Sequence, residues 1–483
     1  MDGLFTAKRF ALLTLVWIGL ACNLASAQPN IVFFVVDDLG AYDTAVAGSR
    51  FHLTPHIDEL AAQGMSFNHA YASHPRCTPS RYGMMSGQFP ARGGVPGKSY
   101  ALELERTSMA EAMNNAGYAT WFVGKWHLTK AGKGKPDEHG FQVNIAGGQA
   151  GAPGSYEWPY DKKKTEHHKT EKNIEGLEDG VPGKMLTDHL TEEAERLIRE
   201  HAATESGQPF FLTLCHYGVH TPFEDTPDRV KMFRQRLKEI GLPDGPEFAE
   251  RDGTVKLNQD NVTYAAMLYR VDESLGRVRA VLAELGLDQD TVIVFTSDHG
   301  GLSNRGFENG RSLATSNAPL RAGKGHLFEG GIRVPLIVAW PGKVAAGSLS
   351  DAVTTNTDFF PTFLSLAGAE LMPEVHRDGK DISSVIHGDA PDFDRGPIFW
   401  HSPRARPNST GDHNASAIRH GRHKLIHWHD DNRDELFDLI ADPSETSDLS
   451  TQHPDIAADL RSQLDDWLAA VDAVEPRNRQ KKK

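Results

Sequence analysis

The 483-residue chain contains 39% hydrophobic and 24% charged residues, which is typical of a globular protein and not of a disordered or repeat protein. Its length predicts one large domain and one smaller domain. The formal net charge of −14 disfavours general binding to nucleic acid or to an anionic membrane, because like charges repel at long range. A small anionic substrate stays compatible with this charge if positive side chains gather at one place.

The first 27 residues have the pattern of an export signal. Lys8 and Arg9 precede an apolar run over residues 10–20, and the small-residue sequence Ala25-Ser26-Ala27 follows it. The run is shorter than the roughly 20 residues that span a bilayer, so we expect an exported protein, periplasmic or secreted, without an integral membrane span after signal removal. Lipid attachment at Cys22 is disfavoured, because no leucine stands three residues before it.

Cysteines are few, and their surroundings differ. Of the three in the chain, signal removal leaves only Cys77 and Cys215, so we do not expect disulfides to hold the fold together. Cys215 ends an apolar run over residues 209–215, where a small buried hydrophobic side chain is the simpler interpretation. Cys77 lies instead between Arg76 and Arg81, followed by what we expect to be a rigid turn. Cationic neighbours lower the pKa of a thiol, which favours a nucleophile at this position.

The elements predicted along the chain alternate between strands and helices. An almost unbroken β-branched and aromatic run at Asn30–Val36 predicts a strand buried on both faces. Further strands are predicted at residues 118–123, 210–215, 291–296 and 334–339, and helices at residues 57–63, 107–116, 186–201, 264–285 and 358–367. This order implies an α/β fold with a large, mostly parallel sheet sandwiched by helices, and function in the loops at the carboxyl ends of the strands.

The pattern changes near residue 388. Short strands are predicted at residues 397–400, 416–419, 423–428 and 435–439, followed by a helix at residues 454–471. We therefore predict a signal peptide at residues 1–27, a catalytic domain at residues 28–387, and a smaller α+β subdomain with a short antiparallel sheet at residues 388–483. Polar stretches at residues 147–154 and 161–172 are expected to be surface loops.

Acidic residues follow two of the predicted strands. Asp37 and Asp38 come directly after the first strand, where a turn or a helix cap is the alternative interpretation. Asp298 and His299 follow another apolar strand, so the four side chains are expected at one edge of the sheet. Carboxylate oxygens with one imidazole suit a hard or borderline divalent ion. We expect Ca²⁺, with Mg²⁺ or Mn²⁺ next.

At Cys77-Thr78-Pro79-Ser80-Arg81 the chain resembles the type I sulfatases of the alkaline-phosphatase-like superfamily. The resemblance continues through residues 86–87, 124–128, 220–222 and 324–335, in the family's order and over most of the chain. It implies an alkaline-phosphatase-like fold and hydrolysis of sulfuric esters. In that family a formylglycine-generating enzyme, the maturase, oxidises the motif cysteine to formylglycine and recognises the pattern Cys-x-Pro-x-Arg.

The resemblance also implies a role for each site residue. The hydrated aldehyde made from Cys77 would offer one hydroxyl to attack sulfur and a second whose deprotonation later expels sulfate. Arg81 and Lys125 would orient this group, and His127 would assist the elimination. His220 and Lys324 would bind the sulfate and protonate or stabilise the departing alkoxide.

By the same resemblance, four residues would hold the metal against the sulfate oxygens: Asp37, Asp38, Asp298 and His299. His299 stands where many members carry Asn, although some related sulfatases carry His there. This difference bears on metal affinity.

Simpler interpretations exist for several of these residues. Lys125 and His127 fit an ordinary loop pair, and His220 fits the end of a strand. Their common position beside predicted strand ends of one sheet favours function. For the substrate, His401, Arg404 and Arg406 would edge the pocket from the C-terminal subdomain, with a solvated loop as an equal alternative.

These patterns together predict a sulfatase that acts on a sulfated saccharide or polysaccharide and depends on the maturase as a second partner. Two other functions stay open. One is a phosphate or phosphonate monoester hydrolase on the same scaffold, and the other is a noncatalytic, metal-dependent carbohydrate-binding protein.

Overall fold

The computed structural model describes residues 28–161 and 174–477. The predicted export signal and most of the polar stretch at residues 161–172 therefore lie outside the described residues. Within the two described ranges, no helix combines the length and apolar character that a membrane crossing requires.

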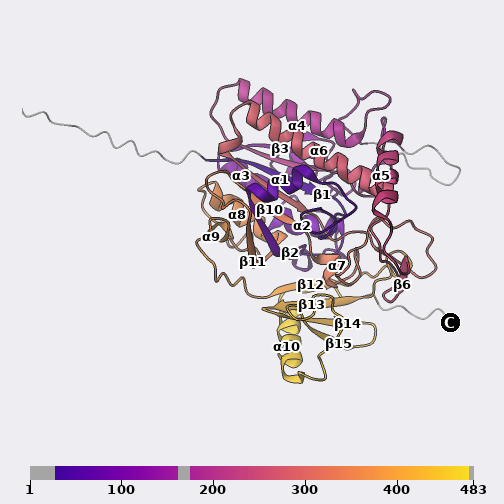
Figure 1. Cartoon of the computed structure of the whole chain (residues 1–483). Coiled ribbons are helices and arrows are strands. Elements are labelled where there is room, and N and C mark those ends of the chain that lie inside the picture. Colours follow the sequence, from indigo (N-terminus) through magenta and orange to yellow (C-terminus); the bar gives the residue numbers. More distant parts are fainter. Residues whose placement is uncertain (1–27, 162–173, 478–483) are drawn as a thin grey trace, which may run out of the picture.

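A central sheet of eight strands organises the large part of the molecule (Figure 1). Its strands lie in the order β11-β2-β10-β8-β1-β5-β3-β4, and they pair in parallel except for β10, which runs antiparallel to β8 and β2. The bounds are β1 (Asn30–Val36), β2 (Met65–Tyr71), β3 (Ala119–Gly124), β4 (Val143–Ile145), β5 (Phe210–Cys215), β8 (Thr291–Ser297), β10 (Leu336–Ala339) and β11 (Ser348–Thr355). The predicted fold class, a large and mostly parallel sheet, is confirmed.

Helices cover both faces of this sheet, and β1 shows why. Every residue of β1 is buried, and successive side chains point to opposite faces. Val32 and Phe34 pack with one set of helices, and Ile31 and Phe33 with another. The first set is α1 (Pro55–Gln63), α4 (Leu186–Ala203) and α6 (Val262–Glu284), with α5 (Pro227–Ile240) against α6; the second is α2 (Cys77–Ser86), α3 (Met109–Asn115), α8 (Phe359–Leu366) and α9 (Ser383–Ile386). Each buried side chain of this size contributes about 1.5–3 kcal/mol.

The C-terminal part forms the predicted antiparallel sheet with one covering helix (Figure 1). Its elements are β12 (Ile398–Ser402), β13 (Ala415–His420), β14 (His423–Trp428), β15 (Arg433–Asp438) and α10 (Pro454–Ala470). A third, three-stranded sheet consists of β6 (Phe248–Glu250), β7 (Thr254–Lys256) and β9 (Asn304–Arg305). The ring of Trp400 in β12 packs edge-on against Tyr71 of β2, which joins the two larger sheets. The boundary predicted at residue 388 falls between α9 and β12 and stays a prediction.

The structure corrects the turn predicted after Cys77. This segment is helix α2, which begins at Cys77 and follows the extended backbone of Arg76. Pro79 is its third residue, and it is tolerated there because the N–H groups of a first helical turn have no partner within the helix. Gly87 ends the helix with a φ of 63°, in the left-handed region that glycine adopts readily. Cys77 is thus fixed at the start of a rigid element.

Candidate active site

The candidate residues meet at the carboxyl ends of parallel strands. Asp37 and Asp38 follow β1, and Asp298 and His299 follow β8, which pairs with β1 in parallel up to the register Val36 with Ser297. Lys125 follows β3, and His220 lies in the loop after β5. Because parallel strands end at the same edge of a sheet, segments far apart in sequence deliver their side chains to one place.

Four of these residues form a compact group of potential metal ligands. Asp37, Asp38, Cys77 and His299 each offer a ligand atom, and these atoms lie within 4.8 Å of one another. Asp298 lies beside them: its Oδ1 is 3.5 Å from His299 Nε2 and accepts a hydrogen bond from the Asp38 N–H at 3.3 Å. All of these side chains are buried.

The charges of this group favour a cation. Burial raises the pKa of Asp37 well above its usual value, and the neighbouring Asp298 raises it further, although Lys125 opposes both effects. Burial acts in the same direction on Asp38, but there Lys324 and other positive neighbours outweigh it and lower the pKa. Buried like charges are costly without a counter-charge, and carboxylate oxygens are the preferred ligands of hard divalent ions. The donor set therefore fits a divalent metal ion.

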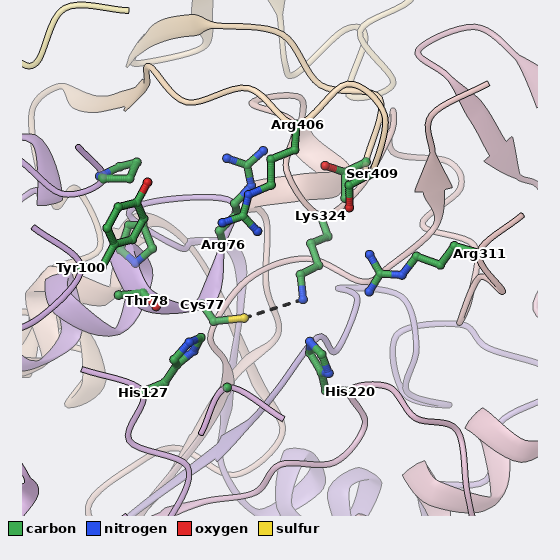
Figure 2. A pocket seen from close by; sticks show the side chains of 14 residues that line it. Arg76, Cys77, Thr78, Tyr100, His127, His220, Arg311, Lys324, Arg406 and Ser409 are labelled. Carbon is green, nitrogen blue, oxygen red and sulfur yellow. Dashed lines mark hydrogen bonds between the residues drawn. The ribbon is translucent and has the colours of Figure 1, made fainter. Parts of the chain in front are cut away.

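Cys77 belongs to this group, and Figure 2 shows it in the cavity, with Lys324, His127 and His220 around it. Its Sγ is 3.2 Å from His299 Nε2, 3.6 Å from Asp37 Oδ1 and 3.7 Å from Lys324 Nζ. Burial alone would raise the pKa of this thiol, but the positive charges of Lys125 and Lys324 lower it well below its ordinary value. The surroundings of residue 77 thus stabilise negative charge.

Basic side chains pair one to one with the three carboxylates, through charge-assisted hydrogen bonds that are stronger than neutral ones. Lys324 Nζ donates to Asp38 at 2.6 Å, Arg81 Nε donates to Asp298 at 2.9 Å, and Lys125 Nζ donates to Asp37.

Two histidines flank Cys77 across the cavity (Figure 2). His127 has a φ of 60° and Asp38 a φ of 63°, a left-handed backbone that is uncommon outside glycine and clusters at functional sites. Burial lowers the pKa of His127. Burial and the charge of Lys324 lower the pKa of His220 to about 3, so both imidazoles are neutral at neutral pH in this state.

The loop at residues 147–154, predicted to be a surface loop, contributes to the cavity wall. Gly151 lies so close to His127 that a Cβ atom added there would meet the imidazole ring at 2.5 Å. Glycine is therefore required at position 151 if His127 is to keep its place.

Of the residues predicted to bind substrate, Arg406 lines the cavity, and His401 and Arg404 do not. The ring of His401 is buried and bonded to Ser416 Oγ at 2.7 Å and to the Val474 carbonyl at 2.8 Å. The Arg404 guanidinium donates to the backbone carbonyl of Glu475 at 2.7 Å.

Sequence reasoning missed several wall residues, which are Arg76, Tyr100, Arg311 and Ser409. From the sequence, Arg76 was recognised only as a cationic neighbour of Cys77 and not as part of the cavity wall. Arg311 belongs to a loop with no motif, and no sequence signal points to it.

Comparison with known proteins agrees with this arrangement. The sulfatase family model matches residues 29–369, and a model described as N-sulphoglucosamine sulphohydrolase, C-terminal, matches residues 323–470. The chain belongs to the sulfatase family. The predicted family, within the alkaline-phosphatase-like superfamily, and the predicted class of enzyme, a sulfuric ester hydrolase, are thereby confirmed.

Similar proteins include bacterial and mammalian sulfatases. A sulfatase of Formosa agariphila is 29% identical over 95% of this chain and 94% of that protein. N-acetylgalactosamine-6-sulfatase of Mus musculus is 31% identical over 82% of this chain and 73% of that protein. A solved structure described as the crystal structure of Ps i-CgsB in complex with k-i-k-neocarrahexaose is 29% identical, with a TM-score of 0.73 over 94% of this chain and 95% of that chain.

Proposed function

We propose that this sulfatase is exported and removes sulfate from a sulfated saccharide, using formylglycine made from Cys77 together with a divalent cation, preferably Ca²⁺. The observation that supports this most is the position of Cys77 Sγ, 3.2 Å from His299 Nε2 and 3.7 Å from Lys324 Nζ, beside buried carboxylates and open to a cavity. The saccharide is supported by the names of the mouse relative and of the Ps i-CgsB complex. Tyr100, 45% exposed, offers an aromatic face on the cavity wall against which a sugar ring can pack.

Four residues would hold the metal: Asp37, Asp38, Asp298 and His299. When bound, the ion would act as a Lewis acid on the sulfate and offset the buried negative charge. The preference for Ca²⁺ follows from the majority of carboxylate oxygens in this donor set.

Residue 77 would provide the nucleophile. Once oxidised and hydrated, it would supply covalent catalysis and a built-in route for sulfate release. Arg81 is held in place by Asp298 Oδ2 and by the Lys125 carbonyl. Its buried Nη2 has no hydrogen-bond partner among the described residues, which leaves a donor for a hydroxyl on residue 77.

Proton transfer would be divided between the two histidines. His127 is neutral, as a base that accepts a proton from residue 77 must be. His220 is neutral without substrate, but an arriving sulfate raises the pKa of an adjacent imidazole and allows it to protonate the leaving alkoxide. Burial would lower the pKa of Lys324, but Asp38 together with Cys77 and Asp37 raises it, so Lys324 would keep its charge and stabilise the sulfate.

The decisive experiment uses protein coexpressed with a formylglycine-generating enzyme. Mass spectrometry of the residue-77 peptide reports oxidation, and sulfate release is measured on 4-nitrophenyl sulfate and on defined sulfated saccharides. We expect Cys77→Ala to lose activity by about 10³-fold or more, because it removes the nucleophile. Cys215→Ala is the control for the loss of a buried thiol: Cys215 lies in β5 beside Arg81, burial raises its pKa to about 11, and its loss should lower activity far less than the loss of Cys77.

Full activity of Cys77→Ala would disprove the proposal. Faster turnover of 4-nitrophenyl phosphate than of the sulfate would favour a phosphate or phosphonate ester hydrolase. Saccharide binding without turnover, by protein whose residue 77 is still a thiol after coexpression, would favour a noncatalytic binding protein.

A further inference from the structure

The outer wall of the reaction cavity is lined by three arginines, Arg76, Arg311 and Arg406 (Figure 2). Arg76 forms a buried ion pair with Asp412 and donates to the Arg404 carbonyl at 2.8 Å. Within the described parts of the chain, the guanidinium groups of Arg311 and Arg406 form no hydrogen bond or ion pair. Their charge is therefore available to an external anion.

Arg311 and Arg406 differ from the other cations around the site, because no carboxylate among the described residues pairs with their guanidinium groups, whereas Arg76 is paired with Asp412. The protein has 65 acidic against 51 basic residues, and the three cations of the inner site are each paired with a carboxylate. Among the described residues that line the cavity around Cys77, none is Asp or Glu, and Glu175, on the adjoining part of the wall, is already paired with Lys135. Arg406 is exposed, and partial desolvation and the like charge of Arg76 lower its pKa, although Asp412 opposes the shift; a bound anion would act in the same direction as Asp412.

The two unpaired arginines lie on loops that are tied to each other. The Arg311 N–H donates to Asn309 Oδ1 at 2.8 Å, and the Arg311 carbonyl accepts from Arg305 Nη1 at 2.7 Å. Asn309 Nδ2 in turn donates to the Asn408 carbonyl at 2.6 Å, two residues from Arg406. The backbones that present the two guanidinium groups are thus held relative to one another before substrate arrives, which reduces the entropy lost on binding.

We propose that Arg311 and Arg406 form a second anion subsite, which binds a second acidic group, a sulfate or a carboxylate, on the saccharide whose first sulfate reacts at residue 77. Figure 2 shows the side chains of Arg406 and Arg311 on different sides of Lys324, and all three line the cavity at residue 77, so an acidic group beside the reacting sulfate would meet one of the two arginines. The planar guanidinium matches either anion through paired hydrogen bonds. This inference rests on the proposed function and specifies its substrate as a saccharide with at least two anionic groups.

The test compares three matched saccharides: one with only the reacting sulfate, one with a second sulfate, and one with a carboxylate. We expect kcat/KM to be highest for a doubly charged saccharide, and the two doubly charged substrates show which anion is preferred. In Arg311→Gln and Arg406→Gln, the ratio of kcat/KM for the doubly over the singly charged saccharide should fall by about ten- to a hundredfold, as expected for one charge-assisted pair. Arg311→Lys and Arg406→Lys should keep part of the preference for the doubly charged saccharide, because they keep the positive charge.

Arg199→Gln is the matched control, because Arg199 lies on the outer surface of α4 and pairs with Glu284. It should leave the ratio unchanged, and melting temperatures establish that each variant is folded. Two results would contradict the second anion subsite: a wild-type enzyme that shows no preference for a second charge, or Gln variants that lower kcat/KM equally for all three saccharides. Neither result would contradict the proposed sulfatase reaction. Should the oxidised wild type hydrolyse none of them, the proposed reaction fails, and the affinity of the Cys77→Ala protein for the three saccharides still decides the subsite.

Discussion

Two clusters of buried charge can be compared within this molecule. The reaction-centre cluster has three carboxylates and three cations and reaches the cavity through Lys324; its members are Asp37, Asp38, Asp298, Arg81, Lys125 and Lys324. The second, here called the junction cluster, consists of Glu329, Glu445 and Lys424 and lies where the small sheet meets the large part. Lys424 Nζ is 3.1 Å from Glu329 Oε1 and 2.8 Å from Glu445 Oε1, and Tyr71 donates to Glu329 at 2.7 Å.

The two clusters differ in access and not in burial. No side chain of the junction cluster lines the reaction cavity, and its carboxylates are satisfied by protein donors, including the Glu329 N–H, which donates to Glu445 at 2.7 Å. Glu329 and Lys324 belong to the same sequence block, residues 324–335, that resembles the sulfatases. Lys324 therefore lines the reaction cavity, whereas Glu329 of the same block connects two sheets. Membership in a motif does not by itself define the role of a residue.

The largest contrast is expected in turnover. Lys324→Ala should lower kcat for sulfate release by about 10²- to 10⁴-fold, because it removes a cation that contacts both Asp38 and Cys77 Sγ. Lys424→Met should retain the wild-type kcat per folded molecule, since the ammonium of Lys424 pairs with Glu329 and Glu445 and does not line the reaction cavity. Equal losses of kcat in the two variants would contradict the claim that only the reaction-centre cluster contributes to turnover.

The reverse contrast is expected in stability. Lys424→Met should lower the free energy of unfolding by about 3–5 kcal/mol, because it leaves two buried carboxylates without the cation between them. Denaturant unfolding measures this change. The control is Lys184→Met, whose partly exposed pair with Glu192 should contribute at most about 1 kcal/mol. An unfolding energy unchanged in Lys424→Met would show that the junction cluster does not stabilise the fold.

Metal removal should affect only the reaction-centre cluster. With Ca²⁺ at a hundredfold excess over its dissociation constant, the native state gains about 2.7 kcal/mol, so chelation should lower the melting temperature. Asp298→Asn should reduce this response, and Asp472→Asn, on the exposed surface, should keep it. Melting temperatures that are the same with Ca²⁺ and with chelator would argue against this donor set as a calcium site.

The smallest effect is expected from pH at the junction cluster. Burial and the charge of Glu329 raise the pKa of Glu445 from 4.5 to about 7, although Lys424 opposes the shift. A raised carboxyl pKa means that the folded state binds more protons than the unfolded state, so this contribution to stability is present at low pH and is lost as pH rises through about 7. We expect a loss of about 1–2 kcal/mol between about pH 5 and pH 8, which Glu445→Gln should abolish. A slope that survives this substitution would assign it to another group.

The buried central strands could be predicted from the sequence, but the strand at the edge of the sheet could not. β1, β5 and β8 are buried along their whole length, so each forms a continuous apolar run that composition alone reveals. β11 was not predicted because only its last two residues, Thr354 and Thr355, are buried, and the rest of the strand is polar or partly exposed. Edge strands have too weak an apolar pattern to be recognised without their neighbours.

The same distinction applies to the site. The residues at the strand ends could be predicted to lie together, because parallel pairing brings those ends to one edge of the sheet regardless of the conformation of the loops. Arg311 could not be placed, since its position depends on the bond between Asn309 and the Asn408 carbonyl, from a loop about a hundred residues away. His401, predicted either to edge the pocket or to lie in a solvated loop, lies in β12, where its ring is bonded to Ser416 Oγ and does not line the cavity.

The connection between β12 and β13 holds Arg406. The chemistry depends on strand ends of the large sheet, whereas part of the outer wall belongs to a hairpin of the small sheet. Changes in the length or sequence of that hairpin would therefore alter the outer wall of the cavity, while the strand ends that carry the inner site stay in place.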